Sequence, residues 1–143
     1  SDMQWLIKPH PSLNIDKMKD QLTVLESVVK IKIISGSFSD AVCNVDLMVG
    51  SGSSTCMEAL AYGIPVIIAG NRKGITENPI PDSVPNNIWR LCYTSNEFCD
   101  AINQLLIKRN LSDFDKQLAI AKQVKENYFE PVSTRNVKLF LDL

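Results

Sequence analysis

Short apolar runs alternate along the chain with segments in which apolar residues recur at helical spacing. Runs of this kind are typical of buried parallel strands. They predict strands over residues 3–8, 30–35, 46–50, 64–69 and 88–93. The periodic segments predict helices over residues 14–28, 37–43, 54–62, 95–107, 112–128 and 131–143. Strands that alternate with helices predict an α/β fold, a Rossmann-like parallel sheet with helices on both faces.

Prolines, glycines and capping residues set the expected boundaries of these elements. Pro9 and Pro11 end the first strand, because proline has no N–H to donate to a neighbouring strand. Gly63 ends the helix over 54–62, and Ser95 caps the helix that follows the last strand. Residues 70–87, rich in proline and polar residues, predict a long loop beyond a strand's C-terminal end. Loops of that length in compact domains are usually functional or disordered.

The charge of the chain is nearly balanced, with 15 Lys and Arg against 16 Asp and Glu. A chain without a strong overall field is not a dedicated nucleic-acid binder, so any phosphate binding must be local. No apolar run approaches the ~20 residues that cross a bilayer, and no leader pattern opens the chain. We therefore expect a cytoplasmic protein without a membrane span in this segment. Its 143 residues suit one compact domain, which we interpret as part of a longer chain because an apolar run begins almost at the first residue.

The cysteines lack the closely spaced pairs that a structural zinc site or a redox dithiol needs. They stand far apart or within apolar runs, at Cys43, Cys56, Cys92 and Cys99. We expect all of them to be reduced and most of them to be buried, with no metal and no cofactor held by the chain.

The strongest local signal is a turn rich in glycine and serine between a predicted buried strand and a predicted helix. Glycines let the backbone approach a phosphate closely, while hydroxyl groups and free N–H groups supply donors. The candidate phosphate ligands are Ser51, Gly52, Ser53, Ser54 and Thr55. The turn lacks the lysine of a P-loop and the third glycine of the dinucleotide fingerprint. An equally good interpretation is that Ser53 merely caps the helix and that the glycines merely make a tight turn.

Two charged residues near this turn have both a functional and a structural interpretation. Glu58 lies one turn into the helix, where its carboxylate can accept hydrogen bonds from ribose or can simply benefit from the helix dipole. Arg72 follows the strand over 64–69, where it can reach a phosphate or belong, with Lys73 and Glu77, to a solvated cluster of charges.

His10 is the only histidine of the chain, and it follows the first strand between two prolines. A loop stiffened in this way can present the imidazole to a phosphate oxygen, with Lys8 adding a positive charge and no metal required. A lone histidine is more often structural. Strands of a parallel sheet end at one edge, so we expect His10 and the Gly/Ser turn to share that edge.

Two segments carry a resemblance to the C-terminal domain of GT-B glycosyltransferases. These segments are residues 8–11, which read KPHP, and residues 50–67, which read GSGSSTCMEALAYGIPVI. The resemblance is closest to bacterial surface-polysaccharide enzymes of the sialyl- and Kdo-transferase-like branches. In those branches a His-Pro motif and a downstream Ser-Ser motif contact the nucleotide phosphate of the donor. His10 with Pro11, and Ser53 with Ser54, match them in order.

The resemblance implies one half of a GT-B fold that binds a CMP-, CDP- or UDP-linked sugar. His10 would act in catalysis on the leaving phosphate, and a missing N-terminal domain would bind the acceptor. The same half-fold occurs in nucleotide-sugar 2-epimerases and in CDP-polyol phosphotransferases, in which a carboxylate at the position of Glu58 often binds ribose. A catalytically inactive nucleotide-binding or interaction module is the third alternative. The chain alone is expected to bind a nucleotide sugar without turning it over.

Overall fold

The computed structural model describes residues 3–10, 12–107, 111–129 and 131–141 of the chain. The chain forms two compact units, Ser1–Asn44 and Val45–Leu143, and each is considered by itself. The single domain expected from the length of the chain stays a prediction. None of the helices within the described ranges combines the length and apolar character needed to cross a membrane.

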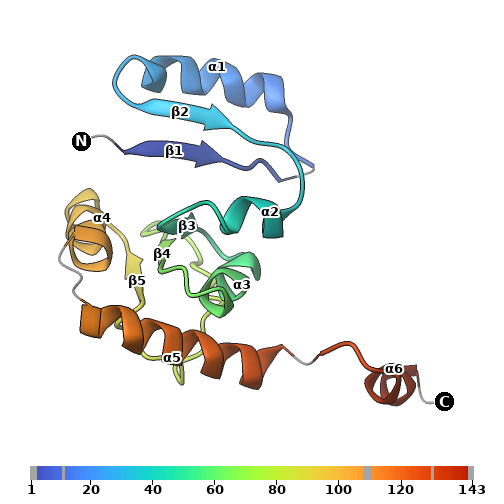
Figure 1. Cartoon of the computed structure of the whole chain (residues 1–143). Coiled ribbons are helices and arrows are strands. Elements are labelled where there is room, and N and C mark those ends of the chain that lie inside the picture. The colour runs from blue at the N-terminus through green and yellow to red at the C-terminus, as the bar shows by residue number, and fades with distance from the viewer. Residues whose placement is uncertain (1–2, 11, 108–110, 130, 142–143) are drawn as a thin grey trace. The chain divides into compact units, whose positions relative to one another are not determined.

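The first unit is a β-α-β arrangement followed by a short helix. Its strands β1 (Gln4–Ile7) and β2 (Lys30–Ile33) pair in parallel, with Gln4 opposite Lys30. Helix α1 (Ile15–Glu26) connects the two strands and lies along them (Figure 1). Helix α2 (Phe38–Val42) follows, and the hydroxyl of Ser37 caps it by accepting a hydrogen bond from the N–H of Asp40. Two parallel strands joined by a helix are what the alternating pattern predicts.

The second unit contains a three-stranded parallel sheet in the order β3-β4-β5. The strands are β3 (Met48–Gly50), β4 (Val66–Ala69) and β5 (Trp89–Cys92). Strand β4 lies in the centre of this sheet, with β3 and β5 on either side of it. All three strands are parallel, so their C-terminal ends, from which the Gly/Ser turn and the long loop depart, share one edge.

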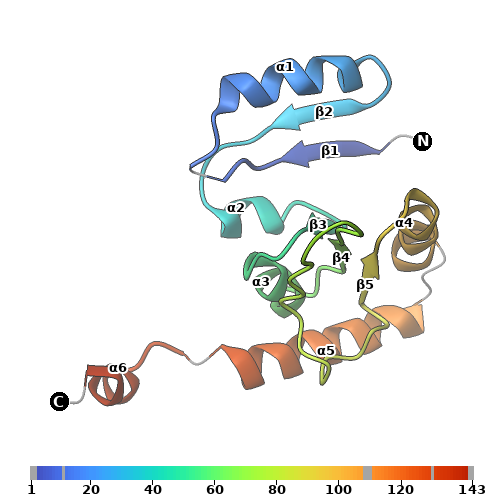
Figure 2. The same cartoon turned by 180° about the vertical axis from the view of Figure 1, so that it is seen from behind.

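Within the described residues, the second unit contains five helical segments. They are α3 (Thr55–Ala61), α4 (Ser95–Ile102), the π-helical turn η1 (Asn103–Ile107), α5 (Leu111–Tyr128) and α6 (Thr134–Leu141). Figures 1 and 2 both show α5 running past α3, and the two helices pack against each other. Gln117 of α5 is buried and donates a hydrogen bond to the carbonyl of Gly63, directly after α3.

The core of the second unit is built around β4, whose Val66, Ile67 and Ile68 are fully buried. Ile67 packs with Cys92 of β5 and with apolar side chains of α4 and η1, among them Leu105. Side chains alternate along a strand, so Val66 and Ile68 face the opposite side of the sheet. Both faces of β4 are therefore covered, as the continuous apolar run predicts.

Every predicted strand and helix has a counterpart, but several boundaries differ. Thr94, not Ser95, is the N-cap of α4, because Thr94 and Glu97 form a reciprocal capping box. Helix α6 begins at Thr134, three residues after Pro131, where we expected the helix to begin. The structure is thus α/β with parallel strands, which form a two-stranded sheet in the first unit and a three-stranded sheet in the second.

Candidate functional site

Two glycines of the Gly/Ser turn are required by the local structure. A β-carbon added to Gly50, the last residue of β3, would lie 2.5 Å from Sγ of the buried Cys56, closer than atoms can approach. Gly52 has a φ of 64°, the left-handed conformation that glycine adopts without strain. The chain therefore leaves β3 and enters α3 through a turn that side chains at these two positions would disturb.

The polar groups of the turn are only partly used by the fold. The hydroxyl of Ser53 accepts from the N–H of Thr55 at 3.3 Å and lies 2.7 Å from the Thr55 hydroxyl. The Ser53 carbonyl accepts from the N–H of Cys56 at 3.0 Å. Ser54 already has helical backbone angles, with φ −57° and ψ −24°, and makes no side-chain capping bond. The hydrogen bond from the Thr55 N–H to the Ser53 hydroxyl caps the first turn, as the structural interpretation of Ser53 predicts. Within the described ranges no hydrogen bond engages the N–H groups of residues 52–54 or the hydroxyls of Ser51 and Ser54.

Glu77, from the long loop, lies against this turn. A β-carbon at Gly52 would meet Cβ of Glu77 at 3.3 Å, its carbonyl oxygen at 3.5 Å and its carboxylate Oε2 at 3.6 Å. The close approach depends on Gly52 having no side chain. An acidic group thus stands beside the donors that the sequence offers to a phosphate.

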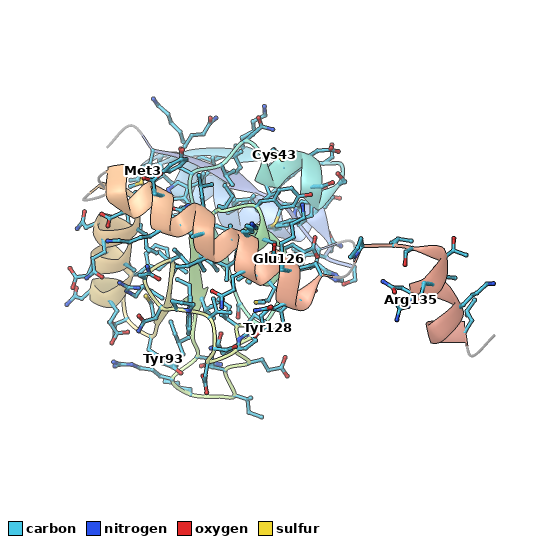
Figure 3. All side chains as sticks on the ribbon, turned by 60° about the horizontal axis from the view of Figure 1, so that its bottom comes forward. Met3, Cys43, Tyr93, Glu126, Tyr128 and Arg135 are labelled. Carbon is cyan, nitrogen blue, oxygen red and sulfur yellow. The ribbon has the colours of Figure 1, made fainter. Side chains whose placement is uncertain are left out.

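The first part of the long loop is organised by its own hydrogen bonds. The N–H of Asn71 donates to the hydroxyl of Thr76 at 2.8 Å, and the N–H of Lys73 donates to the side-chain oxygen of Asn71 at 2.9 Å. Further along, Ile80 and Val84 are buried. The hydroxyl of Ser83 lies 2.6 Å from that of Tyr128, at the end of α5 (Figure 3). The loop is therefore an ordered part of the second unit.

Arg72 interacts electrostatically with Glu97. The N–H of Tyr93 donates to the Glu97 carboxylate at 2.6 Å and that of Thr94 at 3.1 Å. These hydrogen bonds, that of Tyr93 foremost, together with the Arg72 charge, hold the pKa of Glu97 below its usual value. Arg72 is exposed on the loop, so its proposed contact with a phosphate stays a prediction.

Glu58 lies in the first turn of α3 and is half-buried. Its backbone carbonyl accepts from the N–H of Tyr62 at 3.1 Å, an ordinary helical bond. Glu58 lies where the sequence predicts it, one helical turn into the helix that follows the Gly/Ser turn. Its suggested role in binding ribose stays a prediction.

His10 lies in the first unit, after β1, and its side chain is exposed. Its Nδ1 accepts a hydrogen bond from the N–H of Ser12 at 3.2 Å and lies 2.7 Å from the Ser12 hydroxyl. An accepting Nδ1 places the proton of the neutral ring on Nε2. That nitrogen is then a donor suited to a phosphate oxygen. Lys8 is also exposed after β1, whereas Pro11 lies outside the described residues.

The cysteines depart from the expectation that most are buried. All four are free; Cys56 and Cys92 are buried, but Cys43 and Cys99 are exposed. Cys43 follows the short helix α2, and Cys99 lies on a face of α4 other than the one that buries Ala101 and Ile102. Burial is the main cause that raises the pKa of the Cys56 and Cys92 thiols. In the part of the chain that the structure describes, no three His, Cys, Asp or Glu side chains gather as metal ligands.

Comparisons of the chain with family models, with curated proteins and with solved structures found no match. The resemblance carried by residues 8–11 and 50–67 therefore stays an expectation drawn from those residues.

Proposed function

We propose that this chain is the donor-binding half of a GT-B glycosyltransferase of bacterial surface polysaccharide biosynthesis. The observation that carries the proposal is the Gly/Ser turn after β3. It combines a left-handed Gly52 with N–H groups over 52–54 and hydroxyls of Ser51 and Ser54 that the described part of the fold does not use. A set of neutral donors on a turn of this kind suits a phosphate group.

In this proposal the turn acts on the phosphate that leaves the sugar. As the bond between the sugar and the phosphate oxygen breaks, negative charge grows on that oxygen. Donors already in position stabilise this charge without having to reorganise. The carboxylate of Glu58 accepts from the ribose, and a contact of His10 with the phosphate stays an expectation of the resemblance. A separate N-terminal domain would bind and activate the acceptor hydroxyl.

The four free thiols suit a reducing compartment, which supports the proposed location in the cytoplasm. The nucleotide of the donor stays open among CMP, CDP and UDP, because none of the described side chains of the candidate site is specific for cytosine or for uracil.

The test is isothermal titration calorimetry of the chain with CMP, CDP, UDP and GDP. His10→Ala and Ser54→Ala should each weaken binding about tenfold or more, since a hydrogen bond to a charged group contributes about 1.5–3 kcal/mol. Ser27→Ala is the matched control, because Ser27 is exposed and its hydroxyl donates to the nearby Val24 carbonyl. Equal affinities in all four proteins would contradict the assignment of the site, and a folded chain that binds no nucleotide at millimolar concentration would favour an inactive interaction module.

A further inference from the structure

Part of the outer surface of the second unit is apolar. Phe114 and Leu118 are four residues apart on α5 and therefore lie on one face of that helix. A β-carbon at Gly63 would lie 3.7 Å from Cδ2 of Leu118, which places this leucine at the end of α3, beside Tyr62. The three side chains, here called the α3/α5 patch, are exposed to 53% (Tyr62), 47% (Phe114) and 49% (Leu118). Adjoining exposed apolar side chains, unlike single ones, indicate an interaction surface.

A second apolar surface lies on α6 of the same unit. Val137 and Leu141 are four residues apart on this helix and are 43% and 54% exposed. Arg135, labelled in Figure 3, and Lys138 add positive charge, and no acidic residue occurs in the helix. Helix α6 thus carries an apolar face with positive charge beside it.

The charges next to the two surfaces have opposite signs. Asp115 precedes Leu118 by three residues on α5, and Lys138 precedes Leu141 by three residues on α6, so each charge lies beside its leucine. Among the residues that the structure describes, no ion pair involves Asp115, Arg135 or Lys138. Two nearby lysines of α5 are already paired with acids of the same helix, Lys116 with Asp113 and Lys122 with Glu126. The charge left uncompensated beside the α3/α5 patch is therefore negative, and that on α6 is positive.

We propose that two copies of this chain associate, with the apolar face of α6 in each copy covering the α3/α5 patch of the other. Lys138 of one copy then pairs with Asp115 of the second copy. A symmetric pairing uses each contact twice. A stable interface buries about 1,200–2,000 Å² in total, and two small contacts of this kind approach the lower end of that range. We therefore expect a weak dimer, with a dissociation constant on the order of 10–100 µM.

The α6 helix of the same chain is less suited to cover the patch. Residues 129–133 connect α5 to α6, so α6 folded back would first lie along the C-terminal half of α5. This half presents exposed charged side chains, Lys122, Lys125 and Glu126, to the apolar face of α6. Leu118 lies ten residues before the end of α5, about 15 Å along the helix. A second copy approaches the patch without crossing these charges.

The experiment measures the mass of the chain by sedimentation velocity at concentrations from about 1 to about 500 µM, a range that brackets a weak interface. It compares the unchanged chain with Asp115→Lys, with Lys138→Asp and with an equimolar mixture of these two variants. Lys73→Asp is the matched control, because Lys73 is exposed and its replacement reverses the same charge on the long loop. Circular dichroism verifies that each variant is folded.

The unchanged chain should become dimeric as its concentration rises. Each charge reversal should raise the dissociation constant about tenfold, because it places like charges at both contacts of the dimer. In the mixture the two variants should associate with each other as tightly as the unchanged chain does, since every contact again joins a lysine to an aspartate. Leu141→Gln, which removes apolar area without adding charge, should also weaken the dimer, and Lys73→Asp should leave it unchanged.

A chain that stays monomeric over the whole range overturns the proposal. A dimer that neither charge reversal weakens, or a mixture that associates no more tightly than the separate variants, overturns it as well. If the chain is monomeric and the two reversals compensate each other in urea unfolding of the double variant Asp115→Lys/Lys138→Asp, α6 covers the patch of its own chain, and the dimer is refuted.

Discussion

Replacement of Gly50 by alanine tests whether β3, the Gly/Ser turn and α3 are packed as the structure describes. The added methyl group would stand 2.5 Å from Sγ of Cys56 and 3.5 Å from Cε of Met48. Non-bonded heavy atoms prefer about 3.5–4.0 Å, so the sulfur has to move by about 1 Å. Cys56 is fully buried, which leaves it no solvent to move into.

We expect Gly50→Ala to lower the free energy of unfolding by about 1–3 kcal/mol, the usual cost of overfilling a packed core. Cys56→Ala alone removes one buried atom and should cost about 1–2 kcal/mol. In the double variant the new methyl group enters the space that the sulfur has left. The loss of unfolding free energy in the double variant should therefore be about 1–2 kcal/mol smaller than the sum of the two single losses.

The assay is urea unfolding followed by circular dichroism, with the dependence on urea concentration verified to be equal among the variants. Alanine at position 50 also restricts the unfolded chain, but this effect is the same with either residue at position 56 and cancels in the cycle. The control pair combines Gly50→Ala with Cys99→Ala, since Cys99 is exposed on α4. If the loss in the double variant equals the sum of the Gly50→Ala and Cys56→Ala losses to within about 0.5 kcal/mol, the reasoning is refuted, because substitutions at residues in contact are not additive.

Three further outcomes are expected. Gln117→Leu should cost about 1–3 kcal/mol in urea unfolding, because the buried carbonyl of Gly63 loses its donor; a neutral result would show that this bond contributes little. Glu97 has a lowered pKa in the folded chain, so its contribution to stability is present above the ordinary glutamate pKa of about 4.3 and is lost as the pH falls through the lower folded value. Urea midpoints measured across that acid range should therefore fall less steeply for Glu97→Gln than for the unchanged chain. Ellman's reagent should modify the two exposed cysteines, Cys43 and Cys99, rapidly and the two buried ones only on unfolding; four equal rates would contradict the burial described.

The order and type of the elements follow from the sequence because each is marked by more than one signal. Strand β4 combines a continuous apolar run with Gly63 and Pro65 ahead of it, and its side chains are buried on both faces. Where signals compete, the boundary shifts. Thr94 precedes Ser95, and only Thr94 has a glutamate three residues later, which completes the capping box.

The contents of the candidate site are predictable from the sequence only in part. The turn itself is marked by its glycines and serines, and His10 by the prolines on either side. Glu77 and Gly52 are 25 positions apart in the sequence, and Glu77 lies in a loop without periodicity. No local sequence pattern therefore predicts their contact. Its signal is indirect: an acid in a long loop that leaves the same sheet edge as the turn. Solvent exposure of single cysteines likewise depends on which face of a helix packs, as Cys99 on α4 illustrates.

The structure also changes which residues carry the argument for a phosphate site. Packing against Cys56 accounts for Gly50, and the left-handed backbone beside Glu77 accounts for Gly52, so neither glycine requires a ligand. The hydroxyl of Ser53 already interacts with the N–H and the hydroxyl of Thr55. The case for a ligand therefore depends on the polar groups that local structure does not use, above all the hydroxyl of Ser54, which makes no capping bond. For this reason a substitution of Ser54, rather than of a glycine, distinguishes a binding turn from a merely structural one.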